Sequence, residues 1–196
     1  MEQPLGYAVG NALEVKEAIS TLRDHGPADL RELCLILGSQ LVLLAGQAGD
    51  EAQARARLEQ ALSEGRAWAK FRQMVEHQGG DTAFVDDPER LPRAPVAEPL
   101  RAAQDGYVTY IDALTLGLAT VELGGGRQRK GDPIDHSVGI VLEAKVGDQV
   151  SAGQPLLTIH AQSQEAAAAV RERLTAAVSV SPERAQPLPL IFDVIR

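Results

Sequence analysis

The sequence predicts an α/β (α+β) protein in which a helical first segment is followed by a mixed α/β second segment. Apolar residues recur at helical spacing over the first 80 residues, prolines then interrupt residues 81–98, and after that the apolar spacing shifts toward two. We therefore expect a helical segment at 1–80, a linker at 81–98 and an α/β domain at 99–196.

The helical segment should contain four helices. Asn11 and Glu14 have the spacing of a capping box, and the pattern that follows them stops at His25-Gly26-Pro27. The second helix carries leucines from Leu30 to Leu44 in a stripe so broad that both of its sides should be covered. The helices are expected at about residues 11–25, 29–44, 50–62 and 67–77.

The last of these helices places three large apolar residues on neighbouring turns. Trp68, Phe71 and Met74 are expected in the core. Gly79-Gly80 follows the helix and lacks the lysine and serine of a phosphate loop, so it is expected to be a C-terminal cap.

The second segment alternates strands and helices. Its apolar runs are bounded by glycine, aspartate or proline, as is typical of strands. Strands are expected at 107–111, 139–142 and 156–159, helices near 113–123 and 164–178, and a closing strand at 190–195.

Composition narrows the function. Hydrophobic residues make up 44% of the 196 residues, which is enough for a buried core. The net charge of -8 disfavours nonspecific binding to nucleic acid or to an anionic membrane. A small-molecule or protein partner is therefore favoured.

The chain has the features of a cytoplasmic protein. Its single cysteine, Cys34, lies in an apolar run and is expected to be a reduced structural thiol. The start at Met1–Pro4 lacks the basic and apolar regions of a signal peptide. The apolar run Leu41–Gly46 is far shorter than the roughly 20 residues that span a bilayer.

Four stretches carry a resemblance to a known family. The segment from Gln3 to Val15, which reads QPLGYAVGNALEV, closely resembles the middle of pyrimidine-nucleoside and thymidine phosphorylases. Three further stretches agree with the same family in the same order: Gln78–Asp81, Leu123–Arg127, and Asp132–Asp135 leading to Ser137–Gly139.

This resemblance implies a pentosyltransferase that catalyses reversible phosphorolysis of pyrimidine nucleosides, with phosphate as co-substrate and no organic cofactor. Family members are homodimers about twice as long, and their phosphate and base residues lie upstream of the GNALEV segment. The chain is therefore expected to be the C-terminal half of such an enzyme, with no catalytic or substrate-binding residues of the family pattern and with the missing N-terminal half as its partner. The base pocket, which determines the preference for thymidine or uridine, would lie in that half. A surface normally covered by it should be apolar and favour weak association.

Bacterial members of the family also resemble one another in a monovalent cation site. Matched residue by residue, its ligands fall on the carbonyls of Leu5 and Ala8 and on Glu17, and oxygen ligands suit a hard cation such as potassium. The alternative is that Glu17 is simply a solvated helix residue.

Arg127 is the remaining candidate for contact with substrate. It follows Gly124-Gly125-Gly126, and the family places this loop facing the cleft, where it could close over substrate. The loop lacks the strand, turn and helix order of a nucleotide loop, so a helix end with a mobile connection is the favoured interpretation. Asp132, Asp135 and His136 suggest acid and base chemistry, but a polar turn leading into the strand at Gly139 explains them without any reaction. The four histidines have no zinc-ligand spacing.

A rival hypothesis comes from the segment 146–161, which resembles half of a biotinyl or lipoyl carrier domain. Carriers place the modified lysine where this chain has Gln162, Ser163 and Gln164, so the similarity is one of fold and implies a barrel-sandwich (hammerhead) character. The alternative function is a stand-alone, non-catalytic binding or regulatory module.

Overall fold

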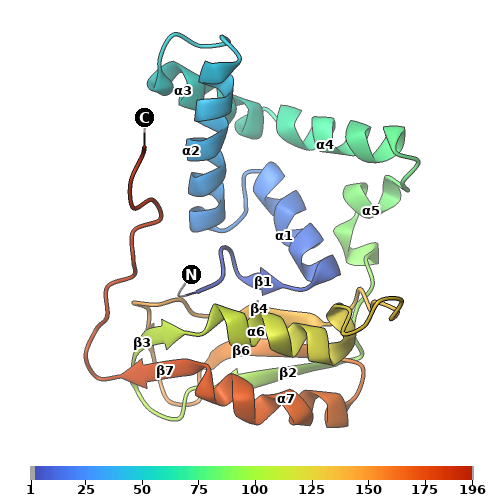
Figure 1. Ribbon diagram of the computed structural model, residues 1–196, viewed down its shortest axis with the longest axis vertical. Coiled ribbons are helices and arrows are strands. Elements are labelled where there is room, and N and C mark those ends of the chain that lie inside the picture. The colour runs from blue at the N-terminus through green and yellow to red at the C-terminus, as the bar shows by residue number, and fades with distance from the viewer. Residues whose placement is uncertain (1–2, 196) are drawn as a thin grey trace. The chain divides into compact units, whose positions relative to one another are not determined.

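The computed structural model describes residues 3–195 as two compact units (Figure 1). We call residues 3–15 and 92–195 the sheet unit, and Lys16–Leu91 the helical unit. Helix α1 (Asn11–Leu22) begins in the sheet unit and ends in the helical unit. The observed boundaries lie at 15/16 and 91/92, whereas the sequence suggested boundaries at 80 and 98. The first residues belong with the C-terminal strands because β1 (Ala8–Val9) pairs with β4 (Gly139–Leu142).

The helical unit consists of the end of α1 and the elements after it. The side chain of Asp50 caps α3 by accepting the Gln53 amide. Gly79, in a left-handed conformation, ends α4 as predicted, with its amide bonded to the carbonyl of Glu76. The elements are α2 (Ala28–Leu44), α3 (Glu51–Ser63), α4 (Arg66–His77), α5 (Ala83–Asp86) and the 3-10 turn η1 (Pro88–Arg90).

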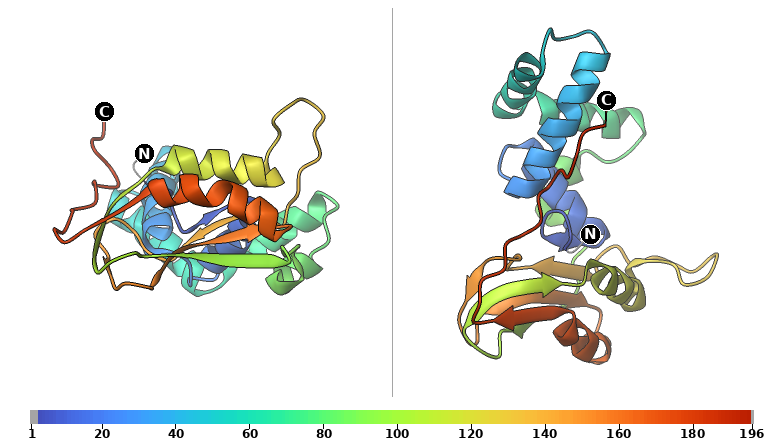
Figure 2. Two further views of the ribbon diagram at one scale, coloured as in Figure 1. Left: turned by 90° about the horizontal axis from the view of Figure 1, so that it is seen from below. Right: turned by 60° about the vertical axis from the view of Figure 1, so that its left-hand side comes forward.

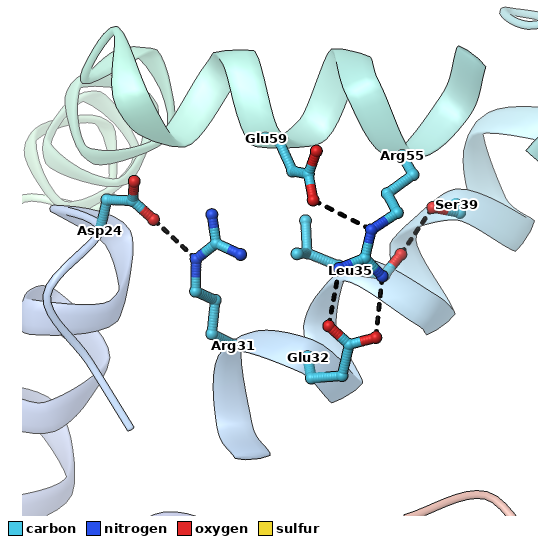
Figure 3. A network of polar contacts seen from close by, with 7 residues as sticks. All are labelled: Asp24, Arg31, Glu32, Leu35, Ser39, Arg55 and Glu59. Carbon is cyan, nitrogen blue, oxygen red and sulfur yellow. Dashed lines mark hydrogen bonds and ion pairs between the residues drawn. The ribbon is translucent and has the colours of Figure 1, made fainter. Parts of the chain in front are cut away.

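Helices α2 and α3 pack closely on one side of α2. Leu35 and Ala54 are buried there, and a Cβ added to Gly38 would lie only 2.9 Å from Leu58 Cδ1. The Ser39 hydroxyl is buried as well and donates to the Leu35 carbonyl within the polar network of Figure 3. A small residue at position 38 therefore allows the two helices to approach.

The other side of α2 is bare among the residues that the structure describes, so the expectation of two covered sides was wrong. Leu37, Leu41 and Leu44 are 53%, 67% and 85% exposed. Cys34 is exposed on the same helix and is not a core thiol.

The aromatic residues of α4 are also less buried than expected. Trp68 and Phe71 are half-buried and Met74 is 46% exposed, so Met74 is not a core residue. The guanidinium of Arg23 lies 5.0 Å from the centre of the Trp68 ring. Trp68 therefore makes a cation–π contact in place of a closed apolar layer.

The expected linker is partly regular. Residues 81–98 contain α5 and η1, and they also contain the start of β2 (Val96–Arg101), which pairs with β6 (Pro155–Ala161). Pro99 is accommodated because β2 is an edge strand of its sheet.

The sheet unit contains two antiparallel sheets and two helices. The first sheet has the strand order β1-β4-β6-β2. In it, β1 covers Ala8–Val9 and β4 covers Gly139–Leu142. The second sheet has the order β5-β3-β7, with β5 (Gln149–Val150), β3 (Gly106–Ile111) and β7 (Val178–Ser181). Helices α6 (Ala113–Thr120) and α7 (Gln164–Ala176) lie side by side against the strands (Figure 2).

The core of the sheet unit lies between these helices and strands. Val108, Leu116, Ile140, Leu157 and Leu174 are all buried. The two sheets form no barrel, so the barrel-sandwich (hammerhead) character is not confirmed.

The prediction of a closing strand at 190–195 was wrong. Residues 191–195 form no regular element, and β7 lies earlier in the chain, beside β3. Across residues 3–195, no helix combines the length and the apolar character needed to cross a membrane.

Candidate functional site

The start of helix α1 is held by an unexpected pair. The Gly10 amide donates to Glu14 Oε1 at 2.8 Å, and the Glu14 amide donates back to the Gly10 carbonyl at 2.8 Å. The capping partner of Glu14 is therefore Gly10, not Asn11 as the sequence suggested. The side chain of Asn11 is left for a different contact, in which its Nδ2 donates to the Gly125 carbonyl at 2.8 Å.

The glycine run ends the π-helical turn that continues α6, whereas α6 itself stops at Thr120. The π-helical turn η2 (Val121–Gly125) follows α6 directly, and Gly124 has a φ of 103°, which favours glycine. The Gly124 carbonyl accepts the amide of Asp135 at 2.9 Å. This bond closes the loop between the glycine run and the following turn.

That turn is organised by the carboxylate of Asp135. Its Oδ1 accepts the amide of Ser137 at 2.9 Å and the hydroxyl at 2.6 Å, and Gln162 Nε2 donates to Ser137 Oγ at 2.9 Å. Burial raises the pKa of Asp135, but the hydrogen bonds from Ser137 and Gln162 outweigh it, so the pKa lies below its usual value. The polar-turn interpretation of Asp135 is confirmed.

The backbone of the turn touches the start of α1. The His136 carbonyl accepts the Ala12 amide at 3.0 Å. Gly10 has a φ of +145°, and a Cβ on it would lie 2.6 Å from the Val138 carbonyl oxygen. Likewise, a Cβ on Gly139 would lie 2.4 Å from the Val9 carbonyl oxygen. Both glycines are needed for this close approach.

Three stretches that carry the resemblance thus meet in the sheet unit: the start of α1, the glycine run and the turn at 132–139. We call Gly124–Gly125 with Asp135–Ser137 the loop root, and residues 126–131 the cationic arm. Arg127, Arg129 and Lys130 are exposed on this arm, and Asp132 Oδ2 accepts the Arg129 amide at 2.7 Å. The site is a tightly bonded root with a positively charged arm.

The predicted cation ligands are divided between the units. Leu5 and Ala8 lie in the sheet unit, whereas Glu17 lies on α1 in the helical unit. Lys145 Nζ donates to the Pro4 carbonyl at 2.7 Å and lies 5.2 Å from the centre of the Tyr7 ring. An ammonium group therefore already binds the loop that would offer carbonyls to potassium. No group of three or more His, Cys, Asp or Glu side chains suited to a metal occurs within residues 3–195.

Sequence reasoning missed the roles of Ser137, Gln162 and Lys145. Ser137 and Gln162 are 25 residues apart and Lys145 lies 141 residues from Pro4, so no local pattern links them. The available signal was the Ser137-Val138-Gly139 stretch, which was used only for the resemblance.

Comparison with known protein families gives one match within the sheet unit. Residues 107–181 match the family described as pyrimidine nucleoside phosphorylase C-terminal domain. The resemblance stated from the sequence is therefore confirmed.

Individual relatives extend the match to the helical unit. Over 195 residues, which is 100% of this chain and 45% of the relative, it is 47% identical to the pyrimidine-nucleoside phosphorylase of Geobacillus stearothermophilus. It is 50% identical to that of Bacillus subtilis over 164 residues, which is 84% of this chain and 38% of the relative. The chain spans less than half the length of these curated relatives.

Proposed function

We propose that this chain serves in a pyrimidine-nucleoside phosphorylase, where phosphate displaces the base from a pyrimidine nucleoside to give the sugar 1-phosphate. The observation that carries the proposal is the 47% identity along the whole chain to a protein of that name. The meeting of the start of α1, the glycine run and the turn at 132–139 supports it. A cytoplasmic location and a homodimeric complete enzyme are part of the same proposal.

The chain alone is proposed to be inactive. A bound phosphate ion is usually stabilised by convergent amides at a helix start together with cations. At the start of α1, the amides of Gly10 and Ala12 are already bonded to Glu14 and His136. The phosphate and base sites would therefore be formed by residues outside this sequence, of the kind that the longer relatives contain.

Arg127 is proposed to contribute from the cationic arm by closing over the substrate phosphate. The arm offers three cations on a chain whose net charge is -8, so it would attract an anion locally. Replacement of Arg127 by alanine in an active assembly should raise KM. Unchanged kinetic constants would remove this role.

A potassium ion held by Leu5, Ala8 and Glu17 is proposed for the complete enzyme only. The ammonium of Lys145 on the Pro4 carbonyl would oppose a second cation nearby, so further oxygen ligands would be needed.

The alternative of a carrier-like module is weakened by the structure at the position of the carrier lysine. Gln162 there donates to Ser137 Oγ, and the Ser163 hydroxyl caps α7 by accepting the Ala166 amide at 3.2 Å. This position is a helix start in the sheet unit. A stand-alone binding module without a cofactor remains the rival that the experiment must separate.

The test is phosphate-dependent release of thymine and uracil. The purified chain is assayed alone and mixed with the part of the Geobacillus stearothermophilus enzyme that this chain does not cover, each with and without potassium. No release alone and release in the mixture would support the proposal. Release by the chain alone would contradict the proposed inactivity, and no release under either condition would favour the binding module.

A further inference from the structure

We propose that Asn11 is a positioning residue whose side chain fixes the loop root and thereby the place of the cationic arm. The inference rests on the proposed function for its effect on the reaction, whereas its structural part can be tested without any activity.

The Asn11 bond falls at the point where the arm departs. Asn11 Nδ2 donates to the carbonyl of Gly125, which is the last residue of the π-helical turn. The next residue, Gly126, is extended, with φ −143° and ψ 170°. The peptide group that Asn11 holds is therefore the last one fixed before the arm.

The second part of the loop root is held by the residue after Asn11. The Ala12 amide donates to the His136 carbonyl, and the Asp135 amide donates to the Gly124 carbonyl. The first turn of α1 thus binds both parts of the loop root, through Asn11 at Gly125 and through Ala12 at His136. Of these two contacts, only that of Asn11 uses a side chain, so it is the one that substitution can remove.

The arm needs such a fixed root because its own backbone is permissive. It begins with Gly126 and ends with Gly131, whose φ is 97°. Between these glycines lie Arg127, Arg129 and Lys130, whose charges suit the phosphate group of a substrate or product. If the Gly125 carbonyl were displaced, the backbone that follows it would take a different direction, and the position of Arg127 would change.

Substitution of Asn11 can separate this role from helix stability. Asn11→Asp removes the donor but places a carboxylate in the first turn of α1, where the helix dipole favours it. Asn11→Ala removes the donor without adding charge, and Asn11→Gln keeps an amide on a longer side chain. Gln104→Ala is the matched control, because Gln104 Nε2 donates to the Val180 carbonyl at 3.0 Å, away from the loop root.

Amide hydrogen exchange is measured first on the 196-residue chain. We expect the Asp135 amide to exchange about fivefold faster in Asn11→Asp and Asn11→Ala, as the loss of one hydrogen bond implies, and to be unchanged in Gln104→Ala. The Tm of Asn11→Asp should fall no further than that of Asn11→Ala, because the helix dipole offsets part of the lost hydrogen bond. Unchanged exchange at Asp135 in both Asn11 variants would overturn the inference.

The kinetic arm uses the active mixture with the upstream part of the Geobacillus stearothermophilus enzyme. Asn11→Asp should raise KM for phosphate several-fold with a smaller change in kcat, and Asn11→Gln should restore part of the loss. Faster exchange with unchanged KM would reject the positioning role in the reaction. A wild-type mixture that releases no base would reject the proposed function instead, and the exchange data would still decide whether Asn11 holds the arm.

Discussion

Arg55 donates two hydrogen bonds to the carboxylate of Glu32, at 2.8 Å from Nη1 and 2.7 Å from Nη2, and so joins α3 to α2 (Figure 3). The same guanidinium donates from Nε to Glu59 at 2.9 Å. Three N–H groups of one side chain thus bond two carboxylates, a geometry that lysine does not reproduce.

This pair predicts a pH dependence of the helical unit. The hydrogen bond from Arg55 lowers the pKa of Glu32 below its ordinary 4.5. A lowered folded-state pKa adds stability above the unfolded value and loses it as the pH falls through the folded value. Because both side chains are more than a third exposed, the effect should be small and should weaken with salt.

Arg55→Lys tests the geometry while keeping the charge. The pKa of Glu32, followed by NMR titration, should move back toward its ordinary value, and the acid-induced fall in Tm should become shallower. An identical Glu32 titration in the wild-type chain and the variant would show that the two-bond contact does not form in solution.

Asp135 should respond to its partner Ser137. Ser137→Ala removes the hydroxyl and, with it, the acceptor for Gln162 in a place where Ser137 is only 4% exposed. The pKa of Asp135 should rise, and stability should fall by about 0.5–1.5 kcal/mol for the lost hydrogen bonds, since the exposed Gln162 amide can bond water instead. NMR titration and chemical denaturation measure both quantities, with the exposed Ser151→Ala as control. An unshifted Asp135 would contradict the network.

Two glycine-to-alanine substitutions should change the stability in opposite directions. Gly10→Ala places a Cβ 2.6 Å from the Val138 carbonyl oxygen at a positive φ and should cost at least about 1–3 kcal/mol. Gly117→Ala lies inside α6 with no atom within 4 Å of the new Cβ and should stabilise by about 0.5–1 kcal/mol. Thermal unfolding compares the two, and a stable Gly10→Ala variant would contradict the close approach of these segments.

The bare face of α2 predicts weak self-association of the 196-residue chain. Leu37, Leu41 and Leu44 are spaced by four and three residues, as in a helix-pairing seam, and all are exposed. Leu41→Lys with Leu44→Lys should shift sedimentation velocity toward monomer. Leu114→Lys, at a position that is 71% exposed on α6, is the control. Loss of association only in that control would assign the contact to α6 instead.

Local patterns were sufficient for most elements of the fold. The helix expected at about 50–62 and the strand at 139–142 follow from short-range sequence, and the structure has both. The pairing of the strands could not be predicted from local patterns. Val9, for example, pairs with Ile140, and no local signal connects these two residues. The apolar alternation at 190–195 resembled a strand but has no ladder partner among the described residues, and a strand needs one.

The candidate site shows the same limit. The glycine pattern correctly predicted the end of α4, since the left-handed conformation of Gly79 is a local requirement. The roles of Asn11 and Ser137 depend on residues distant in sequence, so the periodicity that suggested a capping box could not reveal the bond to Gly125. Likewise, helical spacing shows that α2 is apolar but not which of its faces is covered.

The pairing of β1 with β4 also has a consequence in time. Val9 is synthesised 131 residues before its partner Ile140. At roughly 5–20 residues per second on the ribosome, β1 waits on the order of ten seconds for the strand that completes it. The helical unit, which is encoded entirely within that interval, can fold during the wait. Part of the sheet unit is thus made before the helical unit, and yet the sheet unit is closed after it.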